Sequence, residues 1–253
     1  GAEAAGVIEA VGRGVTDLKV GQRVVYIGAV GTYSEAQNVP AAICVPIPRD
    51  ITDEVAAATH LKGMTTEMLV ERVGNVKKGD VVLMHSASGG VGLLLCQWAK
   101  ARGATVIGTA SSALKCKEIT RAGAKHAIDT SKKDVAKEVA KITKGQGVDV
   151  VFDPVGKDTY ETSLACLKDR GLLASFGGAS GPVPDVNLNE FRYMARAWRL
   201  TRASLFNYKR VFAMIRSGKV KVKIKQRYAL KDAVQMHKDI ESRKLTGITM
   251  LVP

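Results

Sequence analysis

The chain has 253 residues, of which 46% are hydrophobic and 25% charged, the balance of a folded globular protein. It carries a formal net charge of +14, no apolar run is long enough to cross a bilayer, and the first residues do not form a secretory signal. The four cysteines lie far apart, which argues against a disulfide framework and against a cysteine zinc site. We therefore expect a cytoplasmic protein.

Residues 1–57 predict short strands and no long helix. Strand-like stretches lie at Val7–Val11, Arg23–Tyr26 and Ala42–Val45, and glycine and proline separate them. Because Val7–Val11 already resembles a strand with little before it, we expect the front of the first domain to precede this chain.

Residues 81–176 alternate strand and helix in a regular way. Val81–Met84 is an apolar run, and Gly89–Gly92 opens a helix whose apolar side chains recur at helical spacing. Further strands are predicted at Thr105–Ile107, Ala127–Ile128, Val148–Phe152 and Gly171–Phe176, and further helices at Ser112–Ala122, Lys133–Thr143 and Thr159–Leu167. This alternation predicts crossover units and a doubly wound parallel sheet of the α/β class.

The chain after Ser204 returns to a mixed pattern. It predicts, in order, the helix Arg210–Ser217, the strand Val220–Ile224, the helix Lys231–Ser242 and the strand Ile248–Val252. We expect a nucleotide-binding domain of the Rossmann type at 58–204, inserted in a second, β-rich domain that is made of 1–57 and 205–253.

The strongest motif is the segment from His85 to Gly92, with three glycines between a predicted strand and a helix. Backbone N–H groups at a helix start carry partial positive charge, so a pyrophosphate fits there. Glycines let the phosphates approach the backbone closely. The motif therefore predicts a dinucleotide cofactor.

The end of the next strand indicates which cofactor. NAD sites usually place an acidic residue there to bind the ribose 2′-hydroxyl, and Ala110 stands in that place here. Ser111 has a hydroxyl and Lys115 a positive charge for a 2′-phosphate. The alternatives are a helix cap for Ser111 and Ser112 and a solvated lysine. We predict NADPH.

These residues carry a family resemblance that spans nearly the whole chain. The sequence resembles the quinone oxidoreductase and zeta-crystallin branch of the medium-chain dehydrogenase/reductase superfamily, closest to the bacterial NADPH:quinone reductases. The matching segments include Gly1–Val7, Val20–Val24, Leu61–Thr65, Ser88–Gly92, Phe152–Gly156, Ser175–Gly177 and Leu230–Ala233. The resemblance implies a β-rich domain with the GroES fold beside the Rossmann domain.

The resemblance also implies the site. Zinc enzymes of the superfamily have a histidine ligand where this chain has Ala2, so no metal is expected. Thr65 should lie near the nicotinamide, and Phe176 and Gly177 should border its carboxamide. Thr130 stands where related enzymes have a tyrosine near the adenosine phosphate. The implied cofactor-binding residues are Thr65, Ser88, Gly89, Gly90, Val91, Gly92, Ser111, Lys115, Thr130, Phe176 and Gly177.

We predict an NADPH-dependent reductase of a quinone or another electron-poor acceptor, which the family implies to be a homodimer, and two alternative functions remain open. The first is a reductase of α,β-unsaturated carbonyl compounds. The second, from a different class, is an RNA-binding protein, suggested by basic clusters at 132–144, 192–202 and 219–227. The four histidines are scattered, and we name no catalytic residue.

Overall fold

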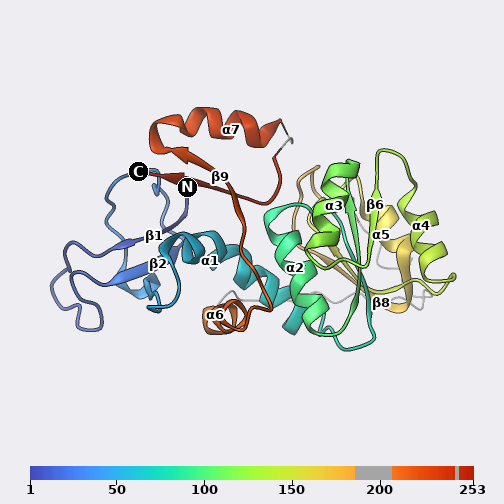
Figure 1. The fold of residues 1–253 in the computed structure, drawn as a ribbon, viewed down its shortest axis with the longest axis horizontal. Coiled ribbons are helices and arrows are strands. Elements are labelled where there is room, and N and C mark those ends of the chain that lie inside the picture. The colour runs from blue at the N-terminus through green and yellow to red at the C-terminus, as the bar shows by residue number, and fades with distance from the viewer. Residues whose placement is uncertain (186–206, 243–244) are drawn as a thin grey trace. The chain divides into compact units, whose positions relative to one another are not determined.

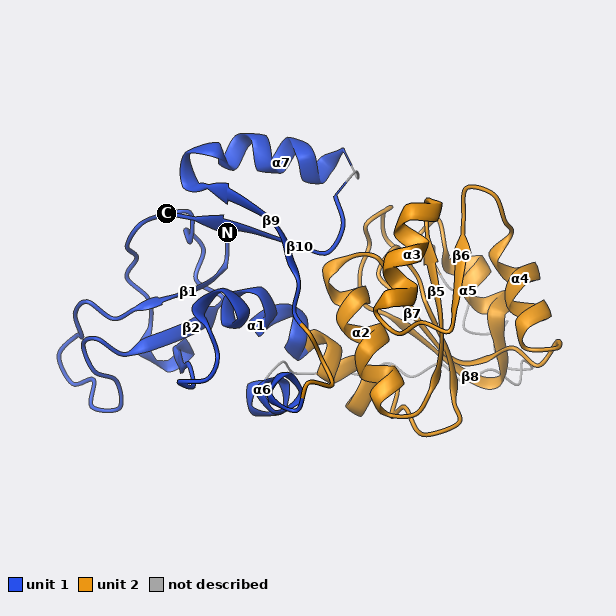
Figure 2. Cartoon of the chain, viewed as in Figure 1, with its two compact units in different colours: residues 1–64, 205–217, 222–253 blue, residues 65–204, 218–221 orange. Residues whose placement is uncertain are grey.

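The computed structural model describes residues 1–185, 207–242 and 245–253. The chain divides into two compact units, shown in Figures 1 and 2. Unit 1 consists of Gly1–Met64, Leu205–Ser217 and Val222–Pro253. Unit 2 consists of Thr65–Ser204 and Gly218–Lys221. The chain therefore leaves the first unit, builds the second and returns.

Unit 2 is built on a five-stranded parallel sheet with the order β6-β5-β4-β7-β8. The sheet grows from β4 in one direction through β5 to β6 and in the other through β7 to β8, so its switch point lies between β4 and β7. The predicted doubly wound fold is confirmed. Its elements are β4 (Val81–Met84), α2 (Gly90–Ala101), β5 (Thr105–Ala110), α3 (Ala113–Arg121), β6 (His126–Asp129), α4 (Val135–Ile142), β7 (Val148–Asp153), α5 (Tyr160–Cys166) and β8 (Leu167–Ser175).

Local signals start and stop these helices. The Ser112 side chain accepts the Lys115 backbone N–H at the start of α3, and Asp134 accepts the Lys137 N–H at the start of α4. Helix α2 ends before Gly103, whose φ of +87° is a conformation that glycine adopts readily. The core beneath these helices is centred on fully buried aliphatic side chains of the middle strands, namely Leu83, Ile107 and Val151.

Unit 1 holds two small sheets and the helices around them. Strands β1 (Glu3–Val7), β2 (Arg23–Ile27) and β3 (Val45–Pro46) are antiparallel, whereas β9 (Ile224–Ala229) and β10 (Ile248–Val252) pair in parallel. The other elements are η1 (Ala41–Ile43), α6 (Tyr208–Arg216), η4 (Leu230–Asp232) and α7 (Ala233–Glu241). Helix α1 (Asp53–Glu67) starts in unit 1 and continues as the π-helix η2 (Met68–Val73) in unit 2.

Three strands were predicted at the wrong place. The first strand is Glu3–Val7 rather than Val7–Val11, because the chain leaves the sheet after Ile8, whose backbone N–H and carbonyl pair with Gln22 and Gly21. Most of Ala42–Val45 is the short 3-10 helix η1, which follows Pro40. In place of Val220–Ile224, strand β9 starts at Ile224, where pairing with Ile248 begins.

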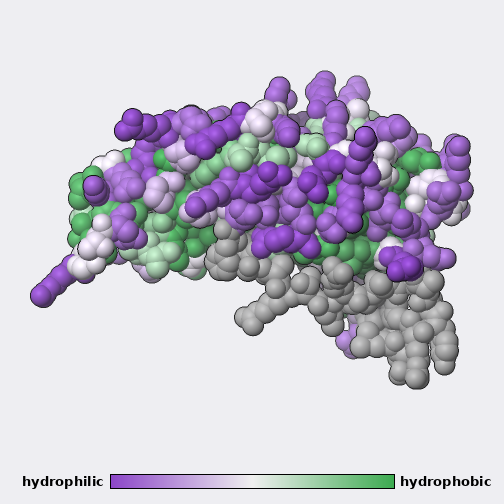
Figure 3. All heavy atoms as spheres, turned by 90° about the horizontal axis from the view of Figure 1, so that it is seen from below, coloured by the Kyte–Doolittle hydropathy of each residue, from purple (hydrophilic) through white to green (hydrophobic). Residues whose placement is uncertain are grey.

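On the face that Figure 3 shows, hydrophilic side chains surround smaller hydrophobic patches. Some large apolar side chains are exposed, among them Val20 and Val30. Within the described residues, no helix combines the length and the apolar character that a membrane crossing requires.

Candidate functional site

The glycine-rich loop lies where the sequence analysis placed it, between the end of β4 and the start of α2. Gly89 is the N-cap of α2, and no side chain caps the helix there. The N–H groups of the first helical turn are therefore not satisfied by a capping side chain and are available to an anion. The structure brings Ser88, Gly89, Gly90, Val91 and Gly92 together at this helix start.

Gly92 shows why the loop needs glycine. A Cβ atom at this position would lie 2.5 Å from the carbonyl oxygen of Ala87, a distance that real contacts do not reach. Helix α2 thus approaches the preceding loop more closely than any side chain permits. This packing holds the start of the helix against the loop that follows β4.

The end of β5 carries the second part of the site. Ala110, its last residue, is buried, and its carbonyl oxygen accepts two hydrogen bonds from Thr130, from the backbone N–H at 2.8 Å and from the hydroxyl at 3.3 Å. Thr130 therefore holds the end of β5 to the start of the loop after β6. Its hydroxyl contacts the protein backbone here, and a contact with a cofactor stays a prediction.

Ser111 and Ser112 have different roles. Ser112 caps α3 by accepting the backbone N–H of Lys115 at 3.3 Å. The exposed Ser111 hydroxyl instead accepts a hydrogen bond from Lys115 Nζ at 3.4 Å. The cap interpretation thus holds for Ser112, whereas Ser111 and Lys115 form a polar pair beside the end of β5. A hydroxyl and an ammonium group at this place are suited to a phosphate.

The end of β7 is organised by a residue to which the sequence analysis gave no role. Asp153 is 1% exposed, and its carboxylate accepts hydrogen bonds at 2.7–3.2 Å. The donors are the backbone N–H groups of Val155 and Gly156 and the hydroxyls of Thr159 and Ser163. An acidic residue at the end of an apolar strand was the signal in the sequence that could have identified Asp153.

Phe176 and Gly177 follow β8 beside that turn. The Phe176 N–H donates to the Asp153 carbonyl oxygen at 2.9 Å. A Cβ on Gly177 would lie 2.5 Å from the Pro154 carbonyl oxygen, so only glycine permits this approach. The carboxyl ends of β7 and β8 are joined in this way, at the sheet edge where ligands of this fold class bind.

Thr65 lies close to the end of α1 and is half-buried. Two positions earlier in this helix, Gly63 lies so close to α6 that a Cβ there would be 2.6 Å from Val211 Cγ1. The packing of α1 against α6 therefore fixes this part of the helix. A place for Thr65 beside a nicotinamide stays a prediction.

Ala2 stands where related zinc dehydrogenases have a zinc ligand, and its methyl side chain has no atom that could bind a metal. The neighbouring Glu3 carboxylate accepts the Leu61 backbone N–H at 2.5 Å and forms an ion pair with Lys62 at 3.3 Å. Among residues 1–185, 207–242 and 245–253, no cluster of His, Cys, Asp and Glu could hold a metal ion. The described donor set does not fit zinc.

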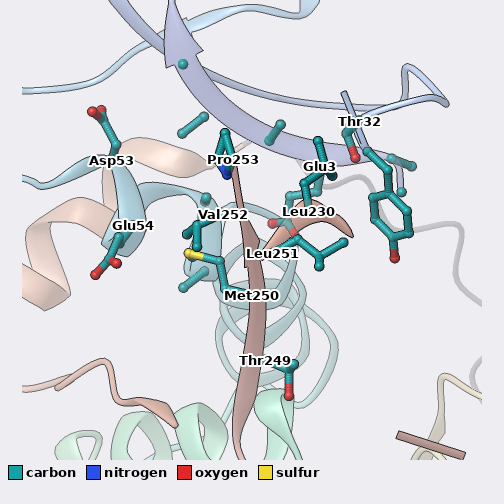
Figure 4. Close-up of a pocket in the computed structure, with 18 of the residues that line it drawn as sticks. Glu3, Thr32, Asp53, Glu54, Leu230, Thr249, Met250, Leu251, Val252 and Pro253 are labelled. Carbon is teal, nitrogen blue, oxygen red and sulfur yellow. The ribbon is translucent and has the colours of Figure 1, made fainter. Parts of the chain in front are cut away.

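Unit 1 also contains a cavity of about 580 Å³, shown in Figure 4. Its wall is largely apolar and includes Leu230, Met250 and Leu251. Three of its carboxylates are engaged in ion pairs, Glu3 with Lys62, Asp53 with Arg23 and Glu54 with Arg227. The hydrogen bonds from Arg227 hold the pKa of Glu54 below its usual value. These acids serve the structure of unit 1, and we assign the cavity no chemical role.

Two family models match the chain. One is described as "Zinc-binding dehydrogenase" and matches residues 90–217, and the other is described as "Alcohol dehydrogenase GroES-like domain" and matches residues 1–49. The second match agrees with the GroES-like domain that the sequence resemblance implied. Together they cover parts of both units.

Individual relatives are similar over the whole chain. A quinone oxidoreductase of Pseudomonas aeruginosa is 43% identical over 265 residues, covering 100% of this chain and 81% of that protein. The crystal structure of Escherichia coli quinone oxidoreductase complexed with NADPH has a TM-score of 0.93 at 42% identity and covers 100% of this chain and 82% of that one. A 2-haloacrylate reductase of Burkholderia sp is 38% identical over 267 residues, covering 100% of this chain and 80% of that protein.

Proposed function

The chain belongs to the zinc-free quinone oxidoreductase branch of the medium-chain dehydrogenase/reductase superfamily, and we propose on this basis that it is an NADPH-dependent quinone reductase. The observation that carries the proposal is the pairing of Ser111 with Lys115 beside Ala110, at the end of β5. In the sheet, β5 is the neighbour of β4, and the loop after β4 leads to the start of α2, which no side chain caps. Because residue 110 is alanine, that position offers no carboxylate to a free 2′-hydroxyl, whereas Ser111 and Lys115 offer a hydroxyl and a positive charge to a 2′-phosphate.

The residues present fit this cofactor. The first turn of α2, with Ser88, Gly89, Gly90, Val91 and Gly92, would hold the pyrophosphate, because it presents N–H groups and the positive end of the helix dipole. When bound, NADPH supplies the reducing equivalents for the acceptor. Because Gly92 has no side chain, the start of α2 can pack closely against the loop before it, and the phosphates can approach the backbone there.

We assign the nicotinamide end of the cofactor to residues near the ends of β8 and α1. Phe176 and Gly177 would border it from the end of β8, and Thr65 would approach it from α1. Thr130 would stay near the adenosine phosphate through its contact with the end of β5. Transfer to a quinone needs a fixed geometry between donor and acceptor more than an acid or base. The task of these residues is therefore to position the cofactor and to exclude water.

A second acceptor class has its own support. The 2-haloacrylate reductase at 38% identity is named for a substrate with an electron-poor double bond. An α,β-unsaturated carbonyl compound is therefore the alternative acceptor for the same cofactor site. A quinone is favoured, because the relatives at 42–45% identity are named quinone oxidoreductases.

Two finer features belong to the same proposal. We propose a homodimer, by analogy with the family, and a cytoplasmic location. The location is supported by the free thiols of Cys44, Cys96, Cys116 and Cys166, which are typical of a reducing compartment.

The test of the function is a panel of acceptors. NADPH oxidation would be followed with benzoquinones, naphthoquinones, a haloacrylate and simple enones, with kcat/KM measured for each. We expect the quinones to give the highest values. Higher values for the enones would transfer the proposal to the second acceptor class. RNA binding at physiological salt by a protein that does not oxidise NADPH would contradict both.

A further inference from the structure

A buried threonine on the neighbouring strand contacts the phosphate-binding loop twice. Thr109 lies in β5 and is 2% exposed. Its hydroxyl oxygen accepts the Ser86 N–H at 3.2 Å, and its carbonyl oxygen accepts the Ala87 N–H at 2.9 Å. Two successive N–H groups of the loop therefore donate hydrogen bonds to one residue of the adjacent strand.

The loop needs this support because its backbone is strained. Ser86 has a φ of +50°, a conformation that residues other than glycine adopt at a cost. Such a residue persists only where its surroundings hold it in place. The carbonyl of Ser86 in turn accepts the N–H of Gly89, the N-cap of α2, at 3.1 Å. The conformation of Ser86 thus determines where the helix start lies.

The Thr109 hydroxyl has a further partner in His85. The Oγ1 of Thr109 lies 3.4 Å from Nδ1 of this histidine, which is 2% exposed. Burial lowers the pKa of His85, so its ring is neutral at physiological pH and one ring nitrogen accepts a hydrogen bond. In the tautomer with its proton on Nε2, Nδ1 accepts a hydrogen bond from the Thr109 hydroxyl while that hydroxyl accepts the Ser86 N–H. In the other tautomer, Nδ1–H donates to the same hydroxyl oxygen.

We propose that Thr109 is the positioning residue of the phosphate-binding loop, because its hydroxyl holds the strained backbone of Ser86 in the conformation that presents the start of α2 to a pyrophosphate. This inference rests on the proposed function. Thr109 acts through the loop and does not itself touch the cofactor. Its effect therefore concerns the pyrophosphate, which NADPH and NADH share, and not the 2′-phosphate.

The test compares two substitutions of the same residue. Thr109→Val keeps the size of the side chain and removes the hydroxyl, whereas Thr109→Ser keeps the hydroxyl and removes the methyl group. For Thr109→Val we expect the dissociation constants of NADPH and NADH, measured by nicotinamide fluorescence, to rise by the same factor of about ten, the loss of one such hydrogen bond. We expect Thr109→Ser to bind like the wild type. Thr120→Val, which removes an exposed hydroxyl from α3, is the matched control.

A cofactor-independent measurement separates this inference from the proposed function. Amide hydrogen exchange at 86–90 in the protein without nucleotide should be faster in Thr109→Val and unchanged in Thr109→Ser. Ser86→Gly, which removes the strain, should reduce the effect of Thr109→Val in the double variant. Unchanged exchange and affinity in Thr109→Val, or faster exchange in Thr109→Ser, would overturn the inference. If the wild type bound neither nucleotide, the proposed function would fail, whereas the exchange result would still decide the role of Thr109.

Discussion

At the scale of single residues, the choice of cofactor depends on very few side chains. The missing acid at Ala110 was visible in the sequence, because it is a property of one position at a predictable strand end. The different roles of Ser111 and Ser112 were not visible, because either of two adjacent serines that precede a helix can cap it as far as the sequence shows. Only the backbone conformation, extended at Ser112, decides which of them caps α3.

The pair of Ser111 and Lys115 leads to a prediction for Lys115→Ala. Loss of the ammonium group should remove most of the preference for NADPH over NADH, while NADH affinity stays within about twofold, since a surface charge away from the bound group contributes little. Lys117→Ala, an exposed lysine of the same helix, is the control. Titration of both nucleotides at low salt would measure the effect, and an unchanged ratio in Lys115→Ala would refute the assignment.

A buried histidine of unit 1 makes stability depend on pH. Burial lowers the pKa of His60 to about 4, below the value of about 6.5 for a free side chain. The unfolded chain therefore binds a proton that the folded chain does not, and stability is complete above about pH 6.5 and falls as the pH drops toward 4. The loss reaches about 3 kcal/mol at the acid end.

Urea unfolding between pH 7.5 and 4.5, compared in the wild type and in His60→Leu, measures this contribution. Nδ1 of His60 has no hydrogen-bond partner among the described residues, so an apolar side chain leaves no donor there unpaired. The variant should show a shallower decline of stability with falling pH. Parallel pH curves for the two proteins would show that His60 is not the cause.

At the scale of elements, the regular part of the chain was predictable and the irregular part was not. Helix α2 follows from apolar spacing, and α3 and α4 follow from apolar spacing and caps, which are local signals. Strands β1, β3 and β9 were misplaced, because short strands depend on partners that are distant in sequence, such as Ile248 for Ile224. Asp153 was missed for a different reason: its donors are near it in sequence, but they converge on the carboxylate only in the folded turn.

The close packing of α2 leads to a prediction for Gly92→Ala. The added Cβ would meet the backbone of Ala87, which cannot yield without moving the loop or the helix. We expect a loss of about 1–3 kcal/mol in unfolding free energy and weaker NADPH binding. Gly6→Ala, whose Cβ would meet no atom within 4 Å, should change the melting temperature little. Equal melting temperatures for the two variants would contradict the close approach described for α2.

At the scale of the whole molecule, unit 2 is doubly wound and carries the proposed cofactor site, and unit 1 has shorter strands in two small sheets. The alternation of strand and helix predicted unit 2, since each crossover forces the next strand to lie parallel. Unit 1 was recognised by resemblance and by its match to the GroES-like family model, because its short strands carry little signal of their own. The proposed acceptor, a quinone, rests on the names of the relatives, because the glycine-rich loop concerns the cofactor and does not select an acceptor.

The most direct test of the central claim is the steady-state oxidation of NADPH by a quinone in the presence of a strong metal chelator, with NADH measured alongside. The account predicts quinone-dependent oxidation of NADPH that the chelator leaves unchanged and that exceeds the rate with NADH. The site at the end of β5 would bind the 2′-phosphate, and no step would need a metal ion. Loss of activity on chelation, or an equal rate with NADH, would contradict it.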